Sequence, residues 1–108
     1  MISLKRIKNI VIEKISDSRV LVSVSTENQH GTLVLNLIVN SETGEIMFVE
    51  LRGDTPDEMP KIANGLIGLN IKNHYYLNNL LPGENKDVSV INSLYYDAFF
   101  GMQEAEVY

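Results

Sequence analysis

The chain has 108 residues, a length that suits one domain with a single hydrophobic core and is too short for two. Apolar residues make up 44% of it and charged residues 21%, which is typical of a globular protein and argues against an intrinsically disordered chain. The formal net charge of −5 disfavours direct binding to nucleic acid, and the lack of cysteine excludes disulfides, thiolate metal sites and thiol nucleophiles.

Short β-branched runs separated by turn residues fill the first half of the chain, a pattern that predicts an antiparallel meander. The expected strands cover residues 9–15, 19–25, 32–39 and 45–51. The first strand has an alternative, because the apolar residues from Leu4 to Ile15 also fit a helical stripe, and only the β-branched run at 10–12 favours a strand. Between the last two strands, Gly44 occupies a turn position where a positive φ is expected.

The hydrophobic period changes after the fourth strand, and a helical region is expected there. Residues 54–58 form a helix-start signal, with a capping residue, a proline and acids in the first turn. Pro60 lacks a backbone donor, so either a short turn precedes a helix from Pro60 or the first turn is irregular. Gly65 and Gly68 weaken this helix and favour an end near Asn70.

Two further helical segments are expected in the last third of the chain. One covers residues 73–81 and stops at Pro82-Gly83; the better defined one follows, with Asp87 as its cap. The apolar side chains of the second segment repeat with the spacing of a helix that packs on a sheet. They are Val88, Ile91, Leu94, Tyr95, Ala98, Phe99 and Met102.

These elements together predict an α+β fold. A four-stranded antiparallel β-meander is expected over about residues 4–51, followed by two or three helices, over about residues 56–81 and 88–102, packed on the sheet. The whole chain, residues 1–108, is expected to form a single domain.

The expected strands are apolar on both faces, whereas an antiparallel sheet covered on one side should alternate between apolar and polar residues. In the third strand Leu35 lies on one face, yet Val34 and Ile38 lie on the other. In the fourth strand the two apolar pairs are Ile46 with Phe48 and Met47 with Val49. Either the helices therefore cover both faces, or another molecule covers one of them, most simply a second copy related by a two-fold axis.

One acidic segment accounts for the whole net charge of the chain, because its six acids are opposed only by Arg52. The six are Glu42, Glu45, Glu50, Asp54, Asp57 and Glu58. Such a segment repels phosphate backbones and attracts basic surfaces. The leading hypothesis is therefore a small acidic protein-interaction module, of the inhibitor or immunity type, that binds the basic surface of a partner such as a nucleic-acid-processing enzyme.

The aromatic residues concentrate in the last third of the chain, mostly as adjacent pairs. Adjacent residues of a helix point about 100° apart, so one member of each pair is expected to be exposed. The candidates for an aromatic binding surface are Tyr75, Tyr76, Tyr96 and Phe100. With the second apolar sheet face they support a rival hypothesis, a homodimeric domain that binds a small ligand or serves as a scaffold. The same aromatic residues are explained equally well by a wide apolar stripe that packs in the core, with the tyrosine hydroxyls at its edge.

Motifs for catalysis or for cofactor binding are missing from the sequence. The histidines, His30 and His74, lack metal-ligand spacing, no serine motif of a hydrolase is present, and the apolar G-x-x-G at Gly65 has no basic companion for a phosphate. We therefore expect no enzyme, no cofactor and no metal. No apolar run resembles a secretory leader or a membrane span, so we expect a soluble, cytoplasmic protein with no membrane partner.

Overall fold

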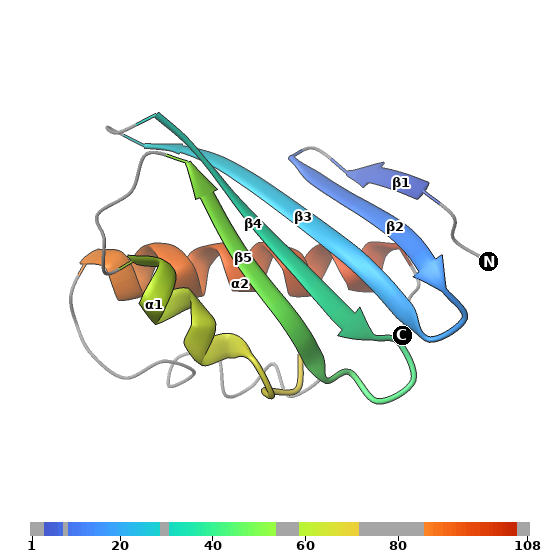
Figure 1. Ribbon diagram of the computed structural model, residues 1–108. Helices are drawn as coiled ribbons and strands as arrows, with labels where there is room; N and C mark the ends of the chain where they lie inside the picture. Colours follow the sequence, from blue (N-terminus) through green and yellow to red (C-terminus); the bar gives the residue numbers. More distant parts are fainter. Residues whose placement is uncertain (1–3, 8, 29–30, 54–58, 72–85, 106–108) are drawn as a thin grey trace.

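The computed structural model describes residues 4–7, 9–28, 31–53, 59–71 and 86–105. Within these residues, five strands form one antiparallel sheet whose spatial order follows the sequence, and helices pack against it (Figure 1). The strands are β1 (Leu4–Ile7), β2 (Ile10–Ser16), β3 (Arg19–Asn28), β4 (Gly31–Asn40) and β5 (Ile46–Gly53). The helices are α1 (Met59–Ala63), the short 3-10 helix η1 (Asn64–Leu66) and α2 (Lys86–Glu104). The predicted α+β fold, a meander followed by packed helices, is confirmed.

The number of strands differs from the prediction, because the first region forms a hairpin rather than one strand. In this hairpin β1 pairs with β2 from Leu4 opposite Glu13 to Ile7 opposite Ile10, so only two residues connect the strands. The connection ends at Asn9, whose carbonyl accepts the amide of Ser25 from β3 at 3.0 Å. Because Lys8-Asn9 is not one of the glycine-containing pairs that mark two-residue turns, the sequence pattern alone does not reveal this turn.

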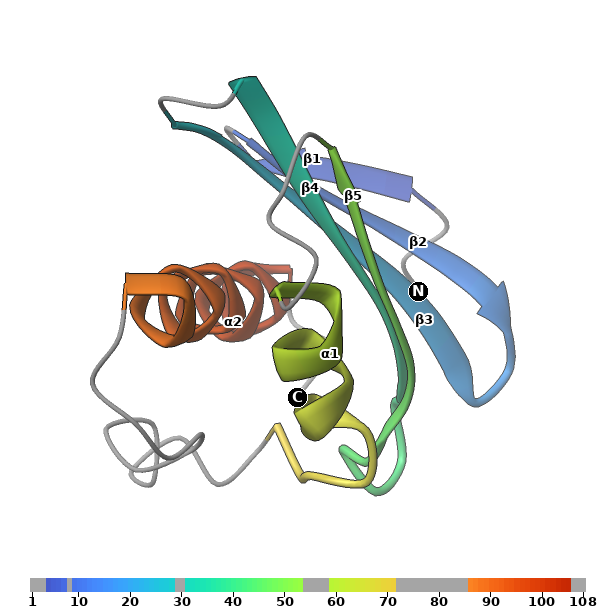
Figure 2. The same ribbon diagram turned by 60° about the vertical axis from the view of Figure 1, so that its left-hand side comes forward.

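One face of the sheet carries the hydrophobic core. Alternate side chains of β2, β3 and β4 are buried there, and every second residue of β4 from Leu33 to Val39 is fully buried. Figure 2 shows α1 and α2 on the same side of the sheet, where they cover this face. No helix of the described residues lies on the opposite face, so the expectation that helices wrap both faces does not hold for this part of the chain.

Strand β5 contains a bulge that changes which of its residues face the core. Val39 pairs with Ile46 but Ile38 pairs with Phe48, so Met47 is the extra residue. Ile46 and Val49 are therefore buried, while Met47 and Phe48 are both exposed. The predicted pairing of Ile46 with Phe48 on one face is wrong, because a strict two-residue alternation fails at a bulge.

The region after β5 is helical over a shorter stretch than expected. Helix α1 begins at Met59, with Pro60 in the first turn, where a missing amide donor costs nothing. The helical region that begins at Met59 ends at Leu66, before the expected end near Asn70. Gly68, at a φ of 90°, turns the chain so that its amide binds the carbonyl of Ile46 at 2.8 Å. The piece expected at 73–81 lies outside the described residues.

Helix α2 matches the predicted stripe in full, since all seven of its predicted core residues are buried. It begins at Lys86, two residues before the expected start at residue 88, so Asp87 lies in the first turn and is not the cap. Its charge there still complements the helix dipole. Gly101 sets how closely the helix approaches the sheet, because a Cβ on it would lie 2.7 Å from Cγ2 of Ile10 in β2.

Candidate interaction surface

The face of the sheet opposite the helices, called here the open face, is left uncovered by the described helices (Figure 2). Its residues follow from the strand register and from the burial of their neighbours on the core face. They include Val11, Glu13, Arg19, Leu21, Ser23, Ser25, Glu27, Thr32, Val34, Asn36, Ile38, Phe48, Glu50 and Arg52.

An apolar row crosses the open face. Leu21, Ile38 and Phe48 are direct cross-strand neighbours on β3, β4 and β5. The first two are half-buried by their neighbours alone, and Phe48 is 44% exposed. Val34 adds a further apolar side chain on β4. An antiparallel sheet that faces water usually carries polar residues on its open side, so this row is unusual for a permanently solvated surface.

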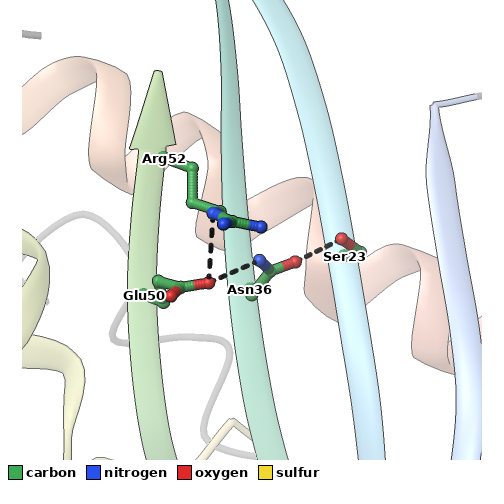
Figure 3. A network of polar contacts seen from close by, with 4 residues as sticks. All are labelled: Ser23, Asn36, Glu50 and Arg52. Carbon is green, nitrogen blue, oxygen red and sulfur yellow. Dashed lines mark hydrogen bonds and ion pairs between the residues drawn. The ribbon is translucent and has the colours of Figure 1, made fainter. Parts of the chain in front are cut away.

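A polar row runs beside the apolar one, and its members bond to one another (Figure 3). The hydroxyl of Ser23 donates to Oδ1 of Asn36, and Nδ2 of Asn36 donates to Oε1 of Glu50 at 3.1 Å. Nε of Arg52 lies 3.7 Å from the same carboxylate oxygen. The sequence pattern does not reveal this row, because its residues come from three strands and only the register brings them together.

The charges on the described part of the open face nearly balance. Glu13, Glu27 and Glu50 contribute three carboxylates, and Arg19 and Arg52 contribute two guanidinium groups, all on exposed residues. The described residues of the open face therefore carry a net charge of −1, whereas the whole chain carries −5.

The predicted acidic segment does not form one surface in the described part of the chain. Glu42 and Glu45 are exposed at the β4–β5 connection, where Oδ1 of Asn40 accepts the amide of Glu42 at 2.8 Å and Gly44 adopts the expected positive φ of 85°. Glu50 lies five residues beyond Glu45, on the open face. Asp54, Asp57 and Glu58 lie outside the described residues.

The predicted aromatic surface is described only on α2. Tyr96 and Phe100 are exposed, and their ring centroids lie 4.6 Å apart with the planes tilted by 54°. Helical geometry places them away from the buried stripe, and hence on the side of α2 that faces away from the sheet. They are therefore separate from the open face. Tyr75 and Tyr76 lie outside the described residues.

A small pocket lies between one end of β3 and α2, with a volume of about 130 Å³. Its lining consists of Thr26, Glu27, Val90, Ser93, Leu94 and Asp97. Partial burial raises the pKa of the Asp97 carboxyl above its ordinary value. This volume suits a few water molecules and is below that of ordinary ligand sites.

Metal binding finds no support in the part of the chain that the structure covers, since no group of three or more histidine, aspartate or glutamate residues there could hold an ion. His30 and His74 lie outside that part. Among the described helices, none combines the length and the apolar character needed to cross a membrane.

Comparisons with protein-family models, with curated proteins and with solved structures found no match for this chain.

Proposed function

We propose that this chain is a protein-interaction module whose binding surface is the open face of the sheet. The observation that carries the proposal is the contiguous apolar row of Leu21, Ile38 and Phe48 on a sheet face that no described helix covers. Covering such a row removes apolar area from water, at about 25 cal/mol for each Å² buried.

The surroundings of the row suit recognition by a protein. The row sits on the three adjacent strands β3, β4 and β5, whose backbone ladders hold it rigid, so little conformational entropy is lost on binding. The apolar row is bordered by polar residues that already hydrogen-bond to one another. Protein interfaces commonly have such an apolar centre with a polar rim.

Binding of a basic partner through the acidic segment, as an inhibitor or immunity-type protein would do, stays a separate prediction. Glu42 and Glu45 are exposed and able to meet a basic surface. The carboxylate of Glu50 already contacts Asn36 and Arg52, which reduces the charge it offers a partner. The apolar row is thus the stronger feature for a binding site.

The test compares three candidate surfaces of the same chain. Variants with paired substitutions would alter the open face (Ile38→Thr with Phe48→Ser), the outer side of α2 (Tyr96→Ser with Phe100→Ser) and the acidic turn (Glu42→Lys with Glu45→Lys). Each immobilised variant would be compared with the natural chain for retention of partner proteins and of a tagged copy of the chain itself.

We expect the open-face variant alone to lose its bound protein, by at least about tenfold, which corresponds to about 1.4 kcal/mol. Loss confined to the α2 variant or to the acidic-turn variant would overturn the assignment of the site. Absence of any bound protein on the natural chain would overturn the proposed function itself. Circular dichroism of each variant would show that the fold is retained.

A further inference from the structure

We infer that the occupant of the open face is a second copy of this chain, packed face to face about a two-fold axis that lies between the two sheets. The inference rests on the proposed function, because it names the partner of the same surface. The assembly would have four layers, with the helices of each copy outside and the two sheets inside.

Charge is the first argument for a second copy. In a two-fold interface the same surface meets itself, so any net charge on it is repelled by an equal charge. The described residues of the open face carry three carboxylates and two guanidinium groups, a net charge of only −1 on a chain of net charge −5, so this repulsion is small. A face built for a basic partner would be expected to concentrate the acids of this chain instead.

The polar row supplies the second argument. Polar groups are costly to bury when they lose hydrogen bonds to water without replacement. Here Ser23, Asn36 and Glu50 already satisfy part of their bonding capacity within one copy, and Arg52 lies beside the Glu50 carboxylate. The row can therefore be covered at reduced cost. Its remaining donors and acceptors face the same set on the second copy, so the two rows can bond to each other.

The area of the face agrees with a homodimer of moderate affinity. At the usual strand spacing the five strands are about 24 Å wide, and the stretch from Arg19 to Ser25 on β3 is about 23 Å long. Two such faces bury roughly 1,100 Å² together as flat surfaces, and side-chain relief adds to this value. Specific interfaces begin at about 1,000 Å². Two sheets packed in this way lie about 10 Å apart with their strands crossing at about −30°.

The first experiment measures the mass of the particle by light scattering after size-exclusion chromatography, from micromolar to near-millimolar concentration. Two variants introduce the same charge at apolar residues of similar exposure. Phe48→Glu alters the open face, where Phe48 is 44% exposed, and Ile67→Glu is the matched control after η1, where Ile67 is 49% exposed. We expect a dimer for the natural chain and for Ile67→Glu. For Phe48→Glu we expect a dimer dissociation constant at least about 100-fold higher, because an unpaired charge would be buried.

A second experiment locates the interface without disturbing its charges. Because the chain has no cysteine, one substitution supplies a single thiol for a short bifunctional maleimide. Ser23→Cys places the thiol on the central strand β3, close to its own copy in a face-to-face dimer, and Ser93→Cys places it at an exposed residue of α2, away from the open face. We expect efficient cross-linking between copies only for Ser23→Cys.

The outcomes separate the inference from the proposed function. A natural chain that stays monomeric at every concentration overturns the inference that a second copy covers the open face. The proposed function then stands only if a foreign protein binds the open face in the capture experiment. A dimer that persists in Phe48→Glu, or that cross-links through Ser93→Cys instead of Ser23→Cys, overturns the inference because the copies meet through another surface.

Discussion

Tyr95 is the largest fully buried side chain described, and its hydroxyl ends without a hydrogen-bond partner among the described residues. Oδ1 of Asn92, three residues earlier on α2, is also buried and has no hydrogen-bond partner among the described residues. Burial raises the pKa of Tyr95 from 10.0 to about 12, because the charged phenolate is poorly solvated in the core.

The alkaline stability of the protein should depend on this tyrosine. Between pH 10 and about 12 the unfolded chain loses the Tyr95 proton while the folded chain keeps it, so the free energy of unfolding falls as pH rises through that window. Below pH 10 the hydroxyl is neutral in both states and contributes no pH dependence. We expect Tyr95→Phe to remove this component.

The measurement is chemical denaturation of the natural chain and of Tyr95→Phe at about pH 8 and about pH 11. At the lower pH the variant should be as stable as the natural chain or more stable, since it buries no unpaired hydroxyl. At the higher pH the difference in free energy of unfolding in favour of Tyr95→Phe should be larger. An equal loss of stability in both proteins between the two pH values would show that Tyr95 does not titrate in this way. Tyr96, which is exposed, supplies the control variant Tyr96→Phe.

At the scale of the elements, Gly53 shows how closely the end of β5 approaches β4. It adopts a φ of 126°, and a Cβ on it would lie 2.4 Å from the carbonyl oxygen of Thr32. Gly31, at the start of β4, adopts a similar φ of 114° but has nothing within 4 Å of that position. The two glycines therefore share a backbone conformation and differ in steric surroundings.

Substituting each glycine in turn separates the free-energy cost of the backbone conformation from the cost of steric contact with a neighbouring strand. Both Gly53→Ala and Gly31→Ala should lower the free energy of unfolding, because a side chain is unfavourable at positive φ. Gly53→Ala should cost about 1–3 kcal/mol more, since its Cβ meets backbone that moves only if the β4–β5 pairing is disturbed. Denaturant unfolding of the two variants gives the difference directly. Equal losses would mean that the strand ends relax freely.

The elements also differ in how far the sequence alone predicts them. The stripe of α2 and the alternation of β4 are local repeats, and both are confirmed residue by residue. The hairpin of β1 and β2 and the bulge at Met47 depend on which strand lies alongside, so local patterns did not predict them. The helical region that begins at Met59 was predicted, but its end was not. That end is decided by the pairing of Gly68 with Ile46.

At the scale of the whole molecule, the inferred dimer makes stability depend on protein concentration. Binding that favours the folded state raises the thermal midpoint as the concentration of the partner rises. We therefore expect the midpoint of the natural chain to increase over a hundredfold increase in its concentration, and the midpoint of Phe48→Glu to stay constant. Circular dichroism and differential scanning calorimetry together cover that range. A natural chain whose midpoint is independent of concentration would contradict the dimer.

The sequence by itself determined the fold class, the core stripe of α2 and the presence of apolar residues on both faces of the sheet. These are properties of periodicity, which neighbouring residues along the chain already contain. Only the tertiary structure decided which sheet face is left open and that Tyr96 and Phe100 lie on a different side of the molecule. It also brought Ser23, Asn36 and Glu50 into one hydrogen-bonded row. The physical reason is that register and packing join residues far apart in sequence, and each such contact depends on the partner strand as much as on the local pattern.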